Sequence, residues 1–354
     1  MKKFSFVALV VLSACISNQP SNGFIIHGNI KGLEDQYLYY DRDFHSDKVT
    51  HKDSFWVENG RFTLRGVVTE PAELDFYTKD FTSFYGQLIV ENSKINYKAD
   101  INDESKERIK GSFSHQLLSR YKEAIECCYQ NYHCEVNEVV QKHLLLRTLK
   151  LVKEYPGHPV SIMGVMHLLR YLNTGLGSAE LLQRIVTLLK PAFKEEEELK
   201  KIEHFANACY LRQVGSQFIQ YQAVSPKGNI TRLSDYYGES YIFINCWASW
   251  CGPCRKEYQY FKDVHQKFKT KGFQVVSISF DSKLSSWQKA INQDAMQDLI
   301  NLSELKNYQN TISKVYGINQ VPDNFLLDKN GTIVRNNIPA EKLMEVMEEL
   351  YANE

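Results

Sequence analysis

The segment that most constrains the fold of this chain is residues 247–254, Trp-Ala-Ser-Trp-Cys-Gly-Pro-Cys. An apolar run over residues 241–245 precedes it and predicts a buried strand, and a helical pattern begins after it near Arg255. Two cysteines separated by two residues at a strand-to-helix junction are typical of a redox-active pair. The junction of residues 247–254 therefore predicts a catalytic dithiol.

The position of each cysteine on the predicted helix indicates its role. On the first turn of a helix, unpaired N–H groups and the helix macrodipole favour negative charge, so the pKa of a thiol there falls below its ordinary value. We expect Cys251 to be the attacking sulfur and Cys254 to resolve the mixed disulfide. The alternative is half of a zinc site, but the chain has no second Cys-x-x-Cys. We therefore expect neither a metal nor a cofactor.

From about Gly215 to the C-terminus the chain resembles the thioredoxin superfamily, and more narrowly its TlpA/ResA-like branch of thiol–disulfide oxidoreductases with an AhpC/TSA-type domain. The resemblance implies a thioredoxin-like α/β domain over residues 213–354. It implies a cis bond between Val321 and Pro322 that faces the cysteines, although an ordinary trans turn proline is the alternative. The backbone of Val321 would then pair with an extended substrate segment, and Trp250 would form an apolar shelf beside Cys251.

Three positions depart from the family pattern: Asn245, Cys246, and Gln259, which replaces the proline that usually kinks the first helix of the family. Asn245 stands where thioredoxins carry a buried aspartate, so another carboxylate must take the proton from Cys254 if that step is base-assisted. Asp281 stands where ResA-like proteins place an acidic residue, and Glu257 is the second proton-transfer candidate. Asp281 could instead simply end a strand or cap a helix. Cys246 stands where a phenylalanine is commoner. It is either a small buried residue or, less favoured, a third redox thiol.

The N-terminus resembles a bacterial lipoprotein signal. Residues 1–15 combine a basic start, an apolar stretch and Leu-Ser-Ala-Cys, so Cys15 would become the lipidated N-terminus. An ordinary secretory signal is the alternative, and either one takes the chain out of the cytosol. Residues 16–23 indicate a polar tether, and no later segment is apolar over a membrane-spanning length. We therefore expect a cell-envelope or periplasmic lipoprotein that the membrane holds only by its lipid.

Residues 24–103 predict an antiparallel β-sandwich-like domain of short strands. Asn59-Gly60 predicts a tight hairpin turn, because such a turn needs positive φ angles. The region resembles the N-terminal β-domain of Gram-negative envelope lipoproteins that share an Asn-Gly-Arg-Phe hairpin. Its aromatic residues fit the core of a sheet better than a binding face. The predicted strands cover residues 24–26, 36–40, 55–57, 61–64, 72–77, 87–90 and 95–98.

Residues 104–212 have helical periodicity and predict a helical spacer that Pro156 and Gly157 interrupt. Of the eight cysteines, lipidation and the dithiol would use three, which leaves five: Cys127, Cys128, Cys134, Cys209 and Cys246. Because five is odd, at least one thiol stays free or pairs outside the chain. Cys127, Cys128 and Cys134 fit free thiols, a local disulfide or, least well, a metal site.

The C-terminal region predicts alternating strands and helices. A second parallel strand is expected over residues 272–279, a hairpin over 324–328 and 332–334, and a closing helix over 340–351. Lys+Arg and Asp+Glu each number 42, so no net charge favours nucleic acid as a partner.

Together these features predict an enzyme, an envelope protein-disulfide oxidoreductase. Gly-Pro between the cysteines resembles the reducing members of the superfamily, so the partners would be client proteins with disulfides and a membrane-linked thiol reductase as electron donor. The alternatives are a disulfide oxidase or isomerase, and a binding lipoprotein with a subordinate redox domain. A peroxiredoxin-like peroxidase is disfavoured because Pro-x-x-x-Thr-x-x-Cys is absent before Cys251.

Overall fold

The structure is a computed structural model, and it describes residues 23–41, 52–79, 84–132, 137–174, 178–238 and 240–352. The predicted signal with Cys15, most of the tether, and Cys134 lie outside the described residues, and of Cys127 and Cys128 only the backbone is described. The chain divides into two compact units. The first contains the β-rich region, most of the first helix and His158–Gly164, and the second contains Cys127–Gly157 and Val165–Glu354.

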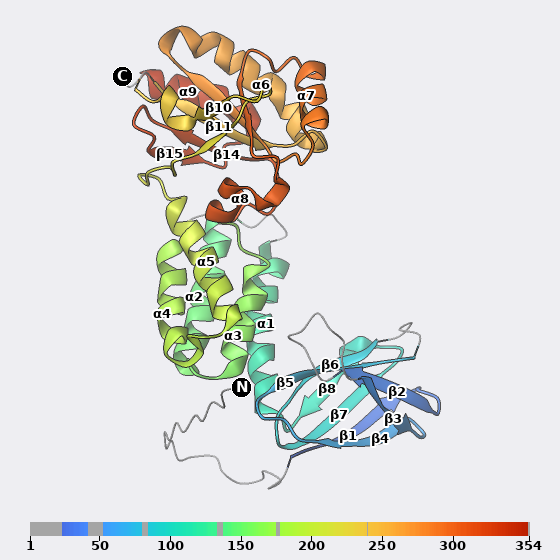
Figure 1. The fold of residues 1–354 in the computed structure, drawn as a ribbon. Helices are drawn as coiled ribbons and strands as arrows, with labels where there is room; N and C mark the ends of the chain where they lie inside the picture. The colour runs from blue at the N-terminus through green and yellow to red at the C-terminus, as the bar shows by residue number, and fades with distance from the viewer. Residues whose placement is uncertain are drawn as a thin grey trace, which may run out of the picture. The chain divides into compact units, whose positions relative to one another are not determined.

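Two four-stranded sheets form the β-rich part of the first unit, among the residues described (Figure 1). The strand order of one is β4-β1-β7-β8, and that of the other is β3-β2-β5-β6. The strands are β1 (Phe24–Lys31), β2 (Gln36–Asp41), β3 (Lys52–Val57), β4 (Arg61–Gly66), β5 (Ala72–Tyr77), β6 (Phe84–Val90), β7 (Lys94–Asp100) and β8 (Arg108–Lys110). All seven predicted strands are present. Pairing is antiparallel except between β1 and β7, which run parallel.

Alternating apolar side chains explain how these strands bury one face. In β4 the residues Phe62 and Leu64 are buried while their neighbours are exposed, which is the period-two pattern of a half-buried strand. Aromatic rings interlock in the core: Phe62 lies 4.5 Å from Phe55 and 5.5 Å from Phe76 between ring centroids. Seven of the ten aromatic residues whose side chains are described in residues 24–103 are buried, which fits the predicted core role better than a binding face.

The Asn59-Gly60 turn has the predicted geometry but a different role. Both residues have positive φ, at 51° and 71°, and the flanking residues Glu58 and Arg61 exchange backbone hydrogen bonds of 3.0 and 2.8 Å. However, β3 and β4 belong to different sheets, and the backbone pairing described between them is the Glu58–Arg61 bridge. The turn therefore passes the chain from one sheet to the other instead of closing a long hairpin.

Helices follow the β-rich region, as predicted. The described helices here are α1 (Phe113–Tyr132), α2 (Glu138–Glu154), α3 (Pro159–Leu169), α4 (Ala179–Phe193) and α5 (Glu197–Leu211). The break at Pro156-Gly157 falls between α2 and α3. In the second unit α4 packs between α2 and α5, and it buries Leu182, Ile185 and Leu189 on one face. Among the described helices, none is both long and apolar enough to cross a bilayer.

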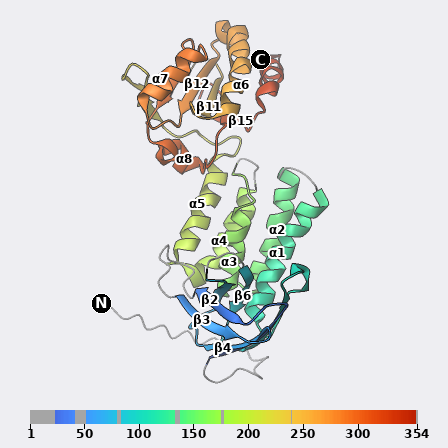
Figure 2. The same ribbon diagram turned by 90° about the vertical axis from the view of Figure 1, so that its right-hand side faces the viewer.

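The C-terminal part is a thioredoxin-like α/β fold with a mixed seven-stranded sheet (Figure 2). The strand order is β10-β9-β13-β12-β11-β14-β15. The strands are β9 (Gln222–Val224), β10 (Ile230–Arg232), β11 (Ile242–Trp247), β12 (Gln274–Ser279), β13 (Ile300–Ser303), β14 (Asp323–Leu327) and β15 (Ile333–Asn336). Strands β11, β12 and β13 are parallel, and β14 pairs antiparallel with β11. The predicted fold class is therefore confirmed.

Four helices accompany this sheet in the described part of the chain: α6 (Gly252–Phe268), α7 (Leu284–Gln293), α8 (Thr311–Tyr316) and α9 (Leu343–Ala352). Helices α6 and α9 pack together and are joined by an ion pair between Lys267 and Glu348. All six side chains of β11 are buried, which fits a central strand covered on both faces. This rigid strand leads directly into the cysteine segment.

Candidate active site

Strand β11 and helix α6 together place the two cysteines. After β11 ends at Trp247, the chain turns so that the N–H of Cys251 donates to the carbonyl of Ala248 at 3.0 Å. Cys251 is then the N-cap of α6, with Pro253 in the first turn, where its missing N–H costs nothing. Cys254 follows one turn into the helix. The predicted strand-to-helix junction is therefore present.

The two cysteines are joined as a disulfide, with their Cα atoms 5.4 Å apart. Both residues are buried, and the backbone N–H of Cys254 donates toward Sγ of Cys251 over 3.2 Å. This N–H is one of the donors that a helix leaves unpaired at its first turn. When the pair is reduced, the same N–H faces the sulfur on which negative charge would form.

The loop before β14 lies against the disulfide. The Val321–Pro322 peptide bond is cis, as the resemblance implied. The carbonyl oxygen of Val321 lies 3.6 Å from Sγ of Cys251. The structure therefore brings together the cysteine pair and the two loop residues that the sequence singled out.

Two aromatic side chains lie beside the cysteine pair and the Val321–Pro322 loop. Trp250, directly before Cys251, is 55% exposed, and its ring lies 6.1 Å from that of Tyr308 between centroids. The Tyr308 ring also lies 5.4 Å from the Phe280 ring between centroids. The pKa of Tyr308 is raised, because burial raises it more than a hydrogen bond with the backbone of Val321 lowers it. Tyr308 thus contacts both substrate-binding candidates, Trp250 and Val321, although no local pattern in the sequence singles it out.

Asp281 is buried at the end of β12 and holds the loop before the cysteines. Its carboxylate accepts a hydrogen bond of 2.9 Å from the N–H of Ser249, and another from the Ser249 hydroxyl. It also accepts one of 2.7 Å from the Ser279 hydroxyl. The N-cap of α7 is Lys283, so Asp281 does not cap that helix. In the part of the chain that the structure describes, Asp281 hydrogen-bonds to serines and to neither cysteine.

Glu257 lies on α6, one turn beyond Cys254, and is half-buried. Burial, and then the negative charge of Glu341, raise the pKa of the Glu257 carboxyl. Asn245 is buried in β11, and its Nδ2 has no hydrogen-bond partner among the described residues. A neutral amide cannot accept the proton of a thiol, so an acid–base role for a carboxylate such as Glu257 stays a prediction.

Comparison with known proteins fits this geometry. Residues 214–336 match the AhpC/TSA family model, and residues 24–118 match a domain of unknown function, DUF4369. The C-terminal part is a thioredoxin-like AhpC/TSA domain. DUF4369 covers the β-rich region and the start of α1.

The curated relatives match less than half of this chain. The thiol-disulfide oxidoreductase ResA of Bacillus cereus is 25% identical over 163 residues, which cover 46% of this chain and 83% of the relative. ResA of Bacillus anthracis is 27% identical over 38% of this chain and 75% of its own length. A solved thioredoxin domain of a Bacteroides vulgatus thiol-disulfide oxidoreductase is 28% identical over 39% of this chain and 97% of its own, with a TM-score of 0.37.

The AhpC/TSA domain also contains a buried free cysteine. Cys246 lies in β11 with no exposed surface, and burial, followed by the charge of Asp323, raises the pKa of its thiol well above the ordinary value. Cys209 on α5 is likewise buried and free, and burial raises its pKa to about 12. Thiols of this kind are inert because the thiolate is the reactive form. The structure therefore favours a packing role for Cys246 over a third redox thiol.

Proposed function

We propose that this chain is a thiol–disulfide oxidoreductase of the cell envelope that reduces disulfides of client proteins through Cys251 and Cys254. One observation carries the proposal: the two cysteines form a disulfide at the N-terminus of α6 beside the Val321 carbonyl. This arrangement lies in an AhpC/TSA domain whose relatives are named thiol-disulfide oxidoreductases.

The cycle begins with the reduced pair. The thiolate of Cys251 attacks one sulfur of the client disulfide, forms a mixed disulfide and releases one client thiolate. Cys254 then loses its proton and attacks Sγ of Cys251, which breaks the mixed disulfide and frees the second client sulfur. Two electrons pass to the client together with the proton of Cys254, the second client thiolate takes its proton from water, and the Cys251–Cys254 disulfide forms. That oxidised state is the one the structure contains.

The surroundings of the pair supply three kinds of assistance. The N–H of Cys254 stabilises charge on Sγ of Cys251, and the helix dipole acts in the same direction. Trp250 offers an apolar shelf, and the backbone of Val321 before Pro322 pairs with an extended client segment. Glu257 exchanges the proton of Cys254, whereas Asp281 positions the segment that carries Trp250.

The completed cycle needs an electron donor and a place in the cell. A membrane-linked thiol reductase would return two electrons to the Cys251–Cys254 disulfide. Lipidation of Cys15 would hold the protein at the membrane, and the tether would leave the folded parts free to meet clients. Mass spectrometry of the N-terminal peptide from cells tests this anchor, since a diacylated Cys15 is expected and an unmodified one would contradict it.

The reduction potential of the pair is the direct test of the proposed direction. Equilibration with a glutathione or dithiothreitol series should give a two-electron couple near about −270 mV or lower, as in thioredoxin. A value near about −120 mV would make the protein an oxidase instead. A Cys251→Ser, Cys254→Ser variant that keeps all cellular function would favour the binding-lipoprotein alternative.

A further inference from the structure

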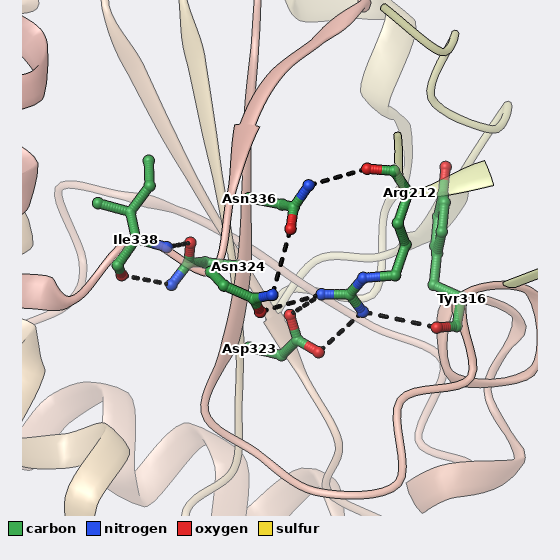
Figure 3. A network of polar contacts seen from close by, with 7 residues as sticks. Arg212, Tyr316, Asp323, Asn324, Asn336 and Ile338 are labelled. Carbon is green, nitrogen blue, oxygen red and sulfur yellow. Dashed lines mark hydrogen bonds and ion pairs between the residues drawn. The ribbon is translucent and has the colours of Figure 1, made fainter. Parts of the chain in front are cut away.

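Arg212 is a fully charged side chain that the structure buries beside the active-site loop. It is the C-cap of α5 and is only 1% exposed. Its guanidinium forms two parallel hydrogen bonds to the carboxylate of Asp323, of 2.9 and 2.6 Å (Figure 3). It also lies 4.6 Å from the centre of the Phe325 ring. Such two-point pairing fixes the plane and the direction of the carboxylate as well as its charge.

The network around Arg212 joins three separate segments. One guanidinium nitrogen donates to the carbonyl of Tyr316, at the end of α8, over 3.5 Å. Another donates to Oδ1 of Asn337 over 3.2 Å, just beyond β15. The Asn336 amide in turn donates to the backbone carbonyl of Arg212 at 2.8 Å (Figure 3). Arg212 is therefore held at both its backbone and its side chain, so it can act as a fixed support.

Arg212 is linked to Cys251 by consecutive residues of the chain, from Asp323 through Pro322 to Val321. Asp323 directly follows Pro322 and is the first residue of β14; we call Val321, Pro322 and this strand residue the proline loop. The Val321 carbonyl at the other end of the loop lies 3.6 Å from Sγ of Cys251. A displacement of the Asp323 carboxylate would therefore move the backbone that faces the disulfide. Asp323 itself is 14% exposed, so an unpaired carboxylate there could turn toward water.

We propose that Arg212 is a positioning residue for client binding, which fixes the proline loop through Asp323 so that the Val321 backbone can pair with a client's extended segment. The inference rests on the proposed disulfide exchange and adds to it a role for the end of the helical region. Lysine could not substitute fully, because it carries the charge without the planar two-point fork. The competing explanation is that Arg212 only anchors α5 to the sheet and contributes nothing beyond stability.

Two substrates separate these explanations in the full-length protein. Insulin presents a disulfide within an extended polypeptide, whereas 2-hydroxyethyl disulfide has no backbone to pair with Val321. For Arg212→Met we expect kcat/KM for insulin to fall by roughly tenfold or more, mainly through KM, because small misplacements are costly. The rate with 2-hydroxyethyl disulfide should stay within about twofold, since Cys251 itself is not moved. Arg212→Lys should lose less, and it serves as the variant most certain to fold.

Asp323 and Met347 supply the matched comparisons. If Arg212 acts through Asp323, Arg212→Met combined with Asp323→Asn should lose no more insulin activity than Arg212→Met alone. Met347→Ala, in the core on α9, lowers stability without altering any partner of Arg212. The inference would be overturned if Arg212→Met lost equal activity on both substrates, in proportion to its loss of thermal stability. Met347→Ala shows how large such a purely stability-driven loss is. Unchanged insulin kinetics in both Arg212 variants would also overturn the inference.

The wild-type protein distinguishes this inference from the proposed function. If the wild type reduces neither substrate, the proposed function fails and the inference falls with it. If the wild type reduces both and the ratio of the two rates is the same in Arg212→Met, the inference alone fails. A lowered ratio with an unchanged reduction potential supports the positioning role, because the dithiol is then intact while client binding is impaired.

Discussion

Asp281 and Ser249 are joined by two hydrogen bonds, in which the N–H and the hydroxyl of Ser249 both donate to one buried carboxylate. Ser249 lies two residues before Cys251, so this pair ties the end of β12 to the segment that delivers the attacking sulfur. The pairing therefore fixes the segment before Cys251, and we propose that Asp281 positions this segment.

Replacing Asp281 with Ala should destabilise the protein and slow disulfide exchange together. The substitution leaves the half-buried donors of Ser249 and the buried hydroxyl of Ser279 without their acceptor, and losing a charged, buried acceptor costs about 1–3 kcal/mol or more. Urea denaturation and insulin reduction would measure the two effects. Ser249→Ala is the matched control, and we expect it to show the same effects at smaller size. An Asp281→Ala protein of unchanged stability that fails only in resolving the mixed disulfide would instead indicate proton transfer by Asp281.

Glu257→Gln should change how stability depends on pH. Burial raises the folded-state pKa of Glu257 above its unfolded value, so the folded state binds this proton more tightly than the unfolded state does. The resulting contribution to the free energy of unfolding is fully present at low pH, where Glu257 is protonated. That stability is lost as the pH rises through the raised folded-state pKa. Glu257→Gln cannot ionise, so we expect it to be stabilised relative to the wild type at neutral pH more than at acidic pH. Urea denaturation of both proteins across this pH range checks the sign.

The same variant tests the chemical role of Glu257. If the carboxyl exchanges the proton of Cys254, Glu257→Gln should slow the release of the second client thiol and flatten the pH profile of that step. Single-turnover kinetics with a preformed mixed disulfide would isolate this release. An identical rate and pH profile in the two proteins would contradict the assignment and leave Glu257 with an effect on stability alone.

Cys246 and Cys209 should resist alkylation in the native, reduced protein. Both are buried, and burial raises the pKa of each thiol, so little thiolate is available to react. Peptide mapping after a timed iodoacetamide pulse should find Cys251 modified and both of these unmodified, and all three modified after unfolding in urea. Native labelling of Cys246 at the rate of Cys251 would revive its interpretation as a third redox thiol.

Local signals explain which parts of the fold could be predicted. Short strand-like runs separated by turn signals located seven N-terminal strands, and the Cys-x-x-Cys segment located the start of α6, because each pattern lies within a few consecutive residues. Strands β8, β9, β10 and β13 were not predicted. They are only three or four residues long, and their pairing partners define them more than their own sequence does.

Long-range pairing explains what the sequence could not provide. Asn59-Gly60 predicts a turn, but whether the two strands share a sheet depends on β1, which pairs with both β4 and β7. Arg212 and Asp323 are 111 residues apart, and nothing near Arg212 distinguishes it from a solvated arginine at the end of a helix. Tyr308 likewise gains its meaning only when the fold brings it beside Trp250.

Asn245→Asp should restore the aspartate of thioredoxins at the expense of stability at neutral pH. Asn245 is buried in β11, so desolvation would raise the folded-state pKa of an aspartate there above its unfolded value. Stability should therefore equal or exceed that of the wild type only at low pH and fall as the pH rises, with a cost of about 1–3 kcal/mol near neutrality.

The catalytic effect of Asn245→Asp separates two ways of handling the Cys254 proton. If Glu257 already serves this step, a second base in β11 should leave the rate of insulin reduction at neutral pH almost unchanged, despite the lower stability. Asn245→Ser is the control, since it removes the amide without adding a charge. A marked rise in the rate in Asn245→Asp, absent in Asn245→Ser, would mean that the wild-type site lacks an effective base and that Glu257 does not fill that role.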